Sequence, residues 1–203
     1  MPSDSLSITR RAFGAGLAAG TGFLAFALPV RALNTDQARA LIDTVVAEVN
    51  SVINSGKSES AMFKDFEQIF ADYADVPTIA RSALGVASKS ASASQMTAFT
   101  KAFRGYISRK YGRRFREFIG GNIEVTDSQP VKSFFEVVSV AHLQGEAPFD
   151  LRWHVSDKSG QNLFFNIIIE GVNMLATERT EIGAMLDKNG GDLEKTIAQM
   201  NTL

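Results

Sequence analysis

Titratable side chains are the residues of this sequence most able to do chemistry, and they are few. The two histidines, His142 and His154, each fall in a predicted strand beside polar neighbours, as is typical of a sheet surface or core edge. Glu67, Asp72 and Asp75 lie close together in the chain, and paired carboxylates can act as general acid and base. Asp75, however, precedes a helix that it can cap, and the other two fall on a solvated helix face. These residues therefore indicate no catalytic site, and we expect no enzyme.

Motifs for metal, nucleotide or covalent chemistry are also missing. No HExxH helix, phosphate-binding loop or G-x-S-x-G elbow occurs after residue 32, and the chain has no cysteine. The run from Gly14 to Ala19 matches the spacing of a dinucleotide fingerprint, but no strand precedes it. Two histidines alone supply too few ligands at close spacing for a metal site. We expect no metal and no cofactor.

The segment 92–119 combines an aromatic stripe with a run of cations. Its apolar residues recur every three or four positions, which predicts one face of a helix that Ser92 or Ser94 can cap and that Gly120 ends. The stripe consists of Met96, Phe99, Phe103, Tyr106, Ile107, Tyr111, Phe115, Phe118 and Ile119. The basic residues are Arg104, Arg109, Lys110, Arg113, Arg114 and Arg116. Such a stripe usually belongs to a core and such a run to a solvated face; a ligand pocket and an anionic partner are the alternatives.

Residues 1–32 resemble a twin-arginine export signal. Arg10 and Arg11 precede Phe13, a weakly apolar segment rich in Gly and Ala follows, and Val30 and Ala32 place small residues at a cleavage site. We expect cleavage and a periplasmic protein consisting of one domain, residues 33–203. An uncleaved membrane anchor is the alternative, but the apolar run is short.

The net charge of the chain argues against nucleic acid as a partner. The chain carries 21 basic and 22 acidic residues, so its net charge is −1. Removing the three arginines and one aspartate of the signal leaves the mature chain still more acidic. We therefore expect no nucleic-acid binding, and any cationic site must be local.

The period of the apolar residues changes along the chain from helix to strand and back. Predicted helices cover residues 34–55, 58–73, 75–84, 92–119, 177–186 and 192–203, with a Ser- and Ala-rich loop at 86–93. Predicted strands cover residues 122–126, 131–143, 149–155 and 163–170. In the last strand, Leu163, Phe165, Ile167 and Ile169 share one predicted face. This order predicts an α+β fold in which a curved antiparallel sheet of about four strands packs against a layer of helices.

Several motifs in order resemble those of the MlaC, or toluene-tolerance, family. The segment 75–85, DVPTIARSALG, resembles its V-D-x-x-x-I-A-R-x-V-L-G signature, and Gln95, Phe99, Phe103 and Tyr111 fit the spacing that follows. The segment 164–175, with Arg179 and the later GGDL, resembles its V-Y-D-V-x-V-E-G-V motif and the residues beyond it. Ser88, Asn162, Asn166 and Glu178 replace the family's Trp, Trp, Asp and Tyr, which indicates a divergent member.

The resemblance implies a periplasmic phospholipid carrier with acyl chains held between sheet and helices. It implies as partners an outer-membrane lipoprotein complex and an inner-membrane ABC transporter with its substrate-binding MCE component, and a role in membrane lipid asymmetry. The expected apolar pocket residues are Phe66, Phe70, Ile79, Leu84, Phe99, Phe103, Tyr106, Ile107, Tyr111, Phe115, Val137, Trp153, Phe165, Ile167, Ile169 and Met174. The residues expected to contact head groups or partners are Arg81, Arg109, Arg113 and Arg179.

Three other readings stay open from the sequence. The cargo of a carrier can be another apolar molecule such as a hopanoid. A protein with a filled core that binds a transporter and carries nothing fits the same helices and strands. A small hydrolase or isomerase on a similar fold requires titratable groups that converge in the pocket, and the predicted apolar faces do not supply them.

Overall fold

Along the chain, the strands follow α1–α4 and precede α5 and α6 in the computed structural model, which describes residues 33–203 apart from the side chains of residues 114–116. The export signal predicted at residues 1–32 lies outside the described residues. The helices are α1 (Thr35–Ile53), α2 (Glu59–Tyr73), α3 (Val76–Leu84), α4 (Ala93–Arg114), α5 (Met174–Lys188) and α6 (Leu193–Thr202), with 3₁₀ turns η1 (Gly85–Lys89) and η2 (Phe115–Phe118). The strands are β1 (Asn122–Val131), β2 (Phe134–His142), β3 (Phe149–Ser156), β4 (Leu163–Ile169) and β5 (Val172–Asn173).

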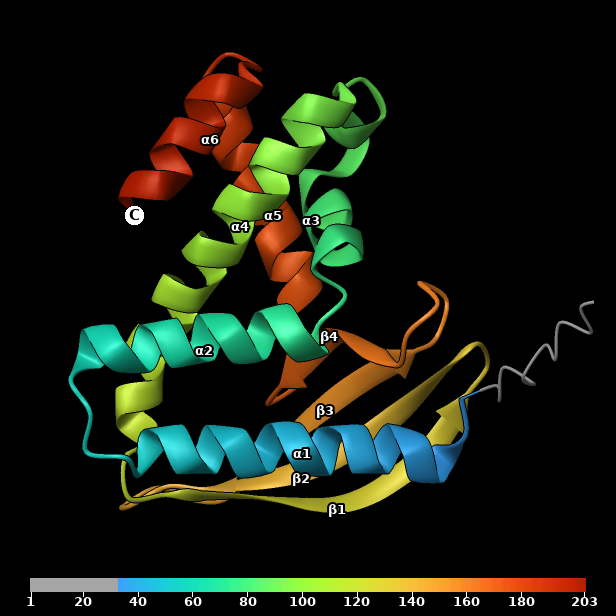
Figure 1. Cartoon of the computed structure of the whole chain (residues 1–203), viewed down its shortest axis with the longest axis vertical. Coiled ribbons are helices and arrows are strands. Elements are labelled where there is room, and N and C mark those ends of the chain that lie inside the picture. The colour runs from blue at the N-terminus through green and yellow to red at the C-terminus, as the bar shows by residue number, and fades with distance from the viewer. Residues whose placement is uncertain (1–32) are drawn as a thin grey trace, which may run out of the picture. The chain divides into compact units, whose positions relative to one another are not determined.

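The strands form one antiparallel sheet in the order β1-β2-β3-β4-β5. Helix α1 packs along β1, β2 and β3, and α2 packs on α1 and on α4 (Figure 1). Helices α3 and α5 pack on each other and on β4, and α6 packs on α4. The predicted α+β fold, with helices on a sheet, is confirmed.

Helices α1, α3 and α4 begin where the sequence places a side chain that accepts from the first turn. Asn34 and Gln37 cap α1 reciprocally, with N–O distances of 2.9 and 3.1 Å. Asp75 Oδ1 accepts from the N–H of Thr78 at 3.1 Å and so caps α3. Ser92 caps α4 in the same way, as predicted, by accepting from an N–H of the first turn at 3.1 Å.

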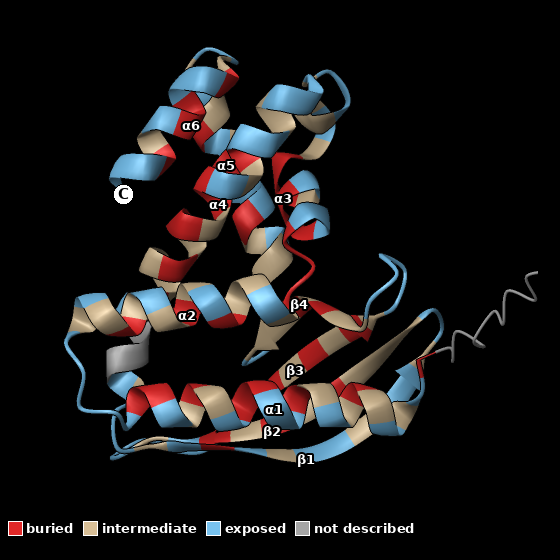
Figure 2. Ribbon diagram, in the orientation of Figure 1, coloured by how far each residue is buried: buried red, intermediate tan, exposed pale blue. Residues whose placement is uncertain are grey.

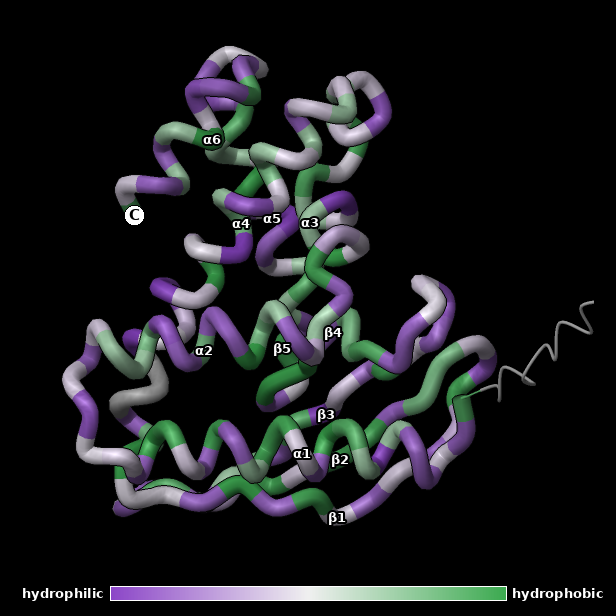
Figure 3. The backbone as a smooth tube through the Cα atoms, viewed as in Figure 1, coloured by the Kyte–Doolittle hydropathy of each residue, from purple (hydrophilic) through white to green (hydrophobic). Residues whose placement is uncertain are grey.

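The core lies between α1 and the sheet and continues among α3, α4 and α5 (Figure 2). Green and purple residues alternate along α1 and α2 in Figure 3, and the buried residues of these two helices are the apolar ones. The bridge from Ala74 to Phe164 ties the connection between α2 and α3 to β4, with the N–H of Asp75 donating to Phe164 O at 2.8 Å. This contact joins the helices to the strand that borders the candidate site.

The first hairpin corrects two predicted strands. The strand predicted to end at residue 126 continues to Val131, because a bulge between Val125 and Asp127 absorbs the irregular sequence. Pro130 is tolerated because β1 is an edge strand and needs ladder bonds on one side only. The strand predicted at 131–143 is wrong at its start, because the chain turns at Lys132, whose φ is +49°.

Smaller differences occur at the other elements. The loop predicted at 86–93 is partly the 3₁₀ turn η1, and the long helix predicted to 119 becomes 3₁₀ after Arg114. Helix α5 starts three residues before the prediction because Asn173 caps it, accepting from the N–H of Ala176 at 3.1 Å. The short strand β5 was not predicted; it follows a turn at Glu170 and Gly171, both with positive φ.

Candidate ligand-binding site

A cavity of about 160 Å³ lies between β4 and the helices α1 to α5. Most of its wall is apolar, with side chains contributed by five helices and two strands. The wall consists of Val45, Val49, Phe66, Ile69, Phe70, Ile79, Phe103, Ile107, Ser108, Tyr111, Gly112, Trp153, Phe164, Phe165, Asn166, Ile167, Ile169, Met174, Leu175 and Glu178. An apolar cavity with a few polar groups is the usual form of a small-molecule site.

Many of the residues predicted for an apolar pocket meet at this cavity. Those in the wall are Phe66, Phe70, Ile79, Phe103, Ile107, Tyr111, Trp153, Phe165, Ile167, Ile169 and Met174. They come from α2, α3, α4, β3, β4 and α5, so elements far apart in the chain converge on one space.

Four of the predicted residues lie elsewhere. Leu84, Phe99 and Val137 are buried in the core and do not line the cavity. Phe99 stacks on Phe103, one helical turn away, with ring centroids 5.9 Å apart. Tyr106 is buried against α5 rather than in the wall. The side chain of Phe115 lies outside the described residues.

The wall also contains residues that the sequence analysis did not select. They are Val45, Val49, Ile69, Ser108, Gly112, Phe164, Asn166, Leu175 and Glu178. Val45, Val49 and Ile69 fall at helical spacing within the segments predicted as helices at 34–55 and 58–73, so the helical period was the available signal for these three residues. Phe164 was missed because strict alternation along β4 places Phe165 on the inner face instead. A bulge near Val155 shifts the register, so Phe164 lies opposite Val155, which is buried.

A hydrogen bond to the buried hydroxyl of Ser139 orients the Trp153 side chain. Its indole N–H donates to Ser139 Oγ at 2.9 Å, and Ser139 is itself fully buried. The edge of Phe164 meets the indole with ring centroids 5.3 Å apart. Because the indole nitrogen is satisfied inside the sheet, the ring can stand in an apolar wall.

Gly112 brings α2 close to the same region of α4. A Cβ at this position would lie 2.5 Å from a ring carbon of Phe63, so no larger residue fits without displacing that ring. The approach of the two helices therefore depends on the absence of a side chain here.

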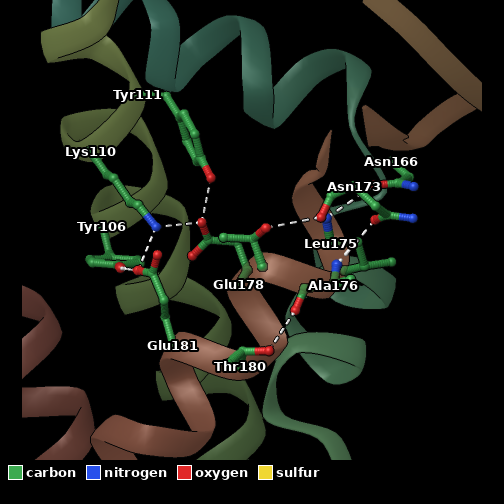
Figure 4. Close-up of polar contacts among 11 residues, drawn as sticks. Tyr106, Lys110, Tyr111, Asn166, Asn173, Leu175, Ala176, Glu178, Thr180 and Glu181 are labelled. Carbon is green, nitrogen blue, oxygen red and sulfur yellow. Dashed lines mark hydrogen bonds and ion pairs between the residues drawn. The ribbon is translucent and has the colours of Figure 1, made fainter. Parts of the chain in front are cut away.

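A polar cluster crosses from α4 to α5 beside the apolar wall (Figure 4). Lys110 Nζ donates to Glu178 Oε1 at 2.7 Å and to Glu181 Oε2 at 2.5 Å. Tyr111 OH donates to Glu178 Oε1, and Tyr106 OH donates to Glu181 Oε2 at 3.1 Å. Two carboxylates therefore share one ammonium group and two phenols.

The donors of this cluster remain protonated at neutral pH. Burial and the nearby Glu178 carboxylate raise the pKa of Tyr106 to about 12. Burial and the hydrogen bond to Glu178 raise the pKa of Tyr111 well above its ordinary value. Burial alone lowers the pKa of Lys110, but its hydrogen bonds to Glu178 and Glu181 outweigh that effect and raise it. The three side chains are thus fixed as donors.

The described basic residues of α4 tie this helix to its neighbours. Arg104 Nε pairs with Glu67 of α2 at 3.1 Å, and Arg109 Nη2 donates to Met200 O of α6 at 2.7 Å. Arg113 donates to the carbonyl of Leu203, directly after α6. The basic run is therefore not simply a solvated face; its described members join four helices. The side chains of residues 114 and 116 lie outside the described part.

The other two predicted arginines, Arg81 and Arg179, are exposed. The guanidinium group of Arg179 lies over Gly85, where an added Cβ would be 3.4 Å from its Nε. Contacts of either residue with a head group or partner stay a prediction.

The histidines and early carboxylates do not converge on the cavity. His154 lies on the sheet face opposite Trp153, its ring 4.5 Å from that of Phe134, and burial lowers its pKa despite the neighbouring Glu136. His142 is exposed. Asp75 caps α3, as predicted.

Two further searches cover residues 33–203. No three His, Asp or Glu side chains in this part gather in a way that would hold a metal ion. No helix in the same part is long and apolar enough to cross a membrane.

Comparison with known proteins gives the family. The model of the MlaC protein family matches residues 42–202. The chain belongs to the MlaC family. The matched residues include the whole cavity wall described above, so the site lies inside the family domain. The resemblance seen in the sequence motifs is confirmed.

A solved structure shares the fold of this MlaC-family chain. It is the phospholipid-binding protein from Ralstonia solanacearum in complex with a phospholipid. The two structures superpose with a TM-score of 0.67 at 19% sequence identity, covering 80% of this chain and 98% of the other. At this identity the likeness establishes the fold that the MlaC-family chain adopts.

Proposed function

We propose that this MlaC-family protein is a periplasmic phospholipid carrier. The observation that carries the proposal is the apolar cavity between sheet and helices, in a fold whose solved neighbour is a phospholipid-binding protein with a phospholipid bound. The family and the twin-arginine-type signal support a periplasmic location. We further propose that the carrier exchanges lipid with an outer-membrane lipoprotein complex and with the MCE component of an inner-membrane ABC transporter.

The free energy of moving acyl chains out of a bilayer explains why an apolar cavity suits this role. Burying a methylene group contributes about 0.8 kcal/mol, so the roughly 30 methylenes of a diacyl lipid lose on the order of 20 kcal/mol when they leave a bilayer. A carrier must recover most of that free energy by burying the acyl chains within one domain. An apolar wall does so without covalent chemistry, and we propose a binding and transport role rather than an enzymatic one.

The cavity is small relative to a diacyl lipid. Its volume of about 160 Å³ is similar to that of the engineered cavity of about 150 Å³ that binds benzene. Full acyl chains therefore need more space than this cavity offers. The aromatic rings and Met174 in the wall suit a space that adapts to different chains.

Native mass spectrometry of residues 33–203, purified without detergent, tests the proposal. We expect an added mass that fragments as phospholipid. Ile167→Asp places a charge in the wall and should remove that mass while the protein stays folded by circular dichroism. A bare polypeptide, unchanged after incubation with liposomes, would refute the carrier and favour an interaction module with a filled core.

Ile168→Asp is the matched control. Ile168 is the next residue of β4, alternates to the other face of the sheet opposite Arg152, and does not line the cavity. The same charge there should leave the bound lipid unchanged. Equal lipid content in Ile167→Asp and wild type would contradict the assignment of the wall.

A further inference from the structure

Asn166 connects a histidine of the sheet to the start of helix α5. Its Oδ1 accepts from the N–H of Leu175, the second residue of α5, at 3.1 Å (Figure 4). Its Nδ2 lies 3.4 Å from Nδ1 of His154, the residue opposite it on β3. Asn166 is 6% exposed, and both Asn166 and Leu175 belong to the cavity wall. The histidine therefore reaches the wall through a single side chain.

The partners of these groups fix which atoms donate. A backbone N–H can only donate, so the Asn166 oxygen must face Leu175 and its NH₂ group must face His154. On the other side of the ring, His154 Nε2 lies 3.5 Å from a carboxylate oxygen of Glu136, which only accepts when it is ionised. The neutral ring therefore carries its proton on Nε2, and its Nδ1 accepts from Asn166.

Protonation of His154 is incompatible with this arrangement. Both nitrogens of a protonated imidazole donate, so the new N–H at Nδ1 faces the NH₂ group of Asn166. If the amide turns to present its oxygen to the ring, its NH₂ group faces the N–H of Leu175 instead. The two neighbours lie at different ends of the amide, so its oxygen cannot face both. Protonation therefore breaks one of the two contacts.

The charged groups around His154 lie on β2 and β3 in the described part of the chain, and β4 contributes the neutral Asn166. Glu136 of β2 faces the ring, Arg152 of β3 pairs with Glu136 at 3.2 Å, and Asp150 lies 3.7 Å from Arg152. Burial lowers the pKa of His154 below its ordinary value of 6.5, and the neighbouring Glu136 offsets this only in part. The side chain is still 13% exposed, so protons from solvent reach it.

We propose that His154 is a positioning residue that makes lipid retention depend on pH: the neutral ring holds Asn166 against the start of α5, and the protonated ring releases Asn166 and with it the bound lipid. This inference rests on the proposed function, because it concerns release of the lipid that the carrier holds. Met174 and Leu175 both line the cavity, so a loosened first turn of α5 weakens the wall itself. Lipid should be held at neutral pH and released as the pH falls below 6.5.

The rate of lipid exchange at two pH values tests the proposal. The protein is loaded from phosphatidylcholine vesicles and then incubated at about pH 7.5 or about pH 5 with an excess of phosphatidylcholine vesicles of another chain length. Mass spectrometry of the re-isolated protein gives the fraction of original lipid. Phosphatidylcholine does not titrate in this range, and ordinary carboxylates stay mostly ionised. Wild type should exchange its lipid about fivefold to tenfold faster at the lower pH.

His154→Asn and His142→Asn form a matched pair, because these are the two histidines of the chain. An asparagine at position 154 offers Asn166 an oxygen near the place of Nδ1 and does not titrate. Its exchange rate should therefore change by less than about twofold between the two pH values. His142 is exposed, so His142→Asn should keep the wild-type response.

Asn166→Asp tests the direction of the effect. A carboxylate keeps an acceptor for the N–H of Leu175 and presents its second oxygen to His154, so it favours the protonated ring. The faster exchange in acid should disappear in this variant.

A readout without lipid follows the contact itself. In the lipid-free protein, NMR should show the amide proton of Leu175 shifting with the same midpoint as the ring of His154. The shift should be absent from His154→Asn. A Leu175 amide that does not follow the ring in wild type refutes the inference, whether or not the variants fold.

The remaining outcomes separate this inference from the function beneath it. Wild type that exchanges lipid equally fast at both pH values refutes the inference and leaves the carrier intact. An acid response that His154→Asn retains, or that His142→Asn loses, refutes the role of His154. Wild type that takes up no lipid at either pH refutes both proposals.

Discussion

Ser139 and Trp153 show how one hydroxyl can position a ring of the cavity wall. The indole N–H lies inside the sheet, where water does not reach, and Ser139 Oγ is its acceptor at 2.9 Å. Removing that oxygen leaves a buried donor unpaired, which costs more than the net worth of the bond.

Ser139→Ala should therefore lower the free energy of unfolding by about 1–3 kcal/mol, measured by guanidinium denaturation. Ser133→Ala, in the exposed hairpin turn, is the control and should change it by less than about 0.5 kcal/mol. When Trp153 is already replaced by Phe, Ser139→Ala should lower the free energy of unfolding by less, because Phe has no N–H that would lose its acceptor. An unchanged cost in that background would show that the hydroxyl acts through another contact.

Helix α6 combines a local cap at its start with a long-range contact from α4 near its end. Asp192 caps it by accepting from the N–H of Lys195 at 3.0 Å, and Arg109 holds the carbonyl of Met200 near its other end. The hydrogen bond from the Lys195 N–H lowers the pKa of Asp192 below its ordinary value of 3.8. The cap is therefore sensitive to acid.

The sign of this dependence follows from the lowered pKa. The stabilisation by the Asp192 carboxylate is complete above the unfolded value, near pH 3.8, and is lost as the pH falls through the folded value. Asp192→Asn keeps a capping oxygen that does not titrate. The variant should lose less stability than wild type between about pH 5 and pH 2, followed by denaturant midpoints. Identical slopes in both proteins would contradict the assignment.

The molecule as a whole carries its ligand site at the meeting of sheet and helices. Its stability should therefore depend on occupancy. A ligand that binds only the folded state adds about 2.7 kcal/mol at a hundredfold excess over its Kd.

Stripping lipid from the protein should lower the denaturant midpoint, and adding phospholipid back should restore it. Ile167→Asp should show no response to added lipid, whereas Ile168→Asp should respond as wild type does. A midpoint that is the same with and without lipid would show that lipid does not bind the folded protein in preference to the unfolded one.

The starts of α1, α3, α4 and α6 could be predicted because their causes are local. Asn34, Asp75, Ser92 and Asp192 each cap a helix through an N–H no more than three residues away. The first hairpin could not be placed, because its turn at Lys132 and Ser133 contains no Gly, Asn or Asp, the residues that usually supply the positive φ found here at Lys132. Its register follows from pairing with β2 instead.

The sequence by itself determined the caps, the apolar stripes and the order of motifs that indicates the family, since all of these depend on neighbours along the chain. Tertiary structure alone decided which apolar side chains face a space. Phe99 and Phe103 occupy equivalent positions on one stripe, yet Phe99 lies in the core and Phe103 at the cavity. Likewise Glu178 becomes a buried wall residue only because Lys110 and Tyr111 of α4 meet it there. A stripe records that a face is buried, whereas a cavity exists where elements distant in the chain fail to fill the space between them.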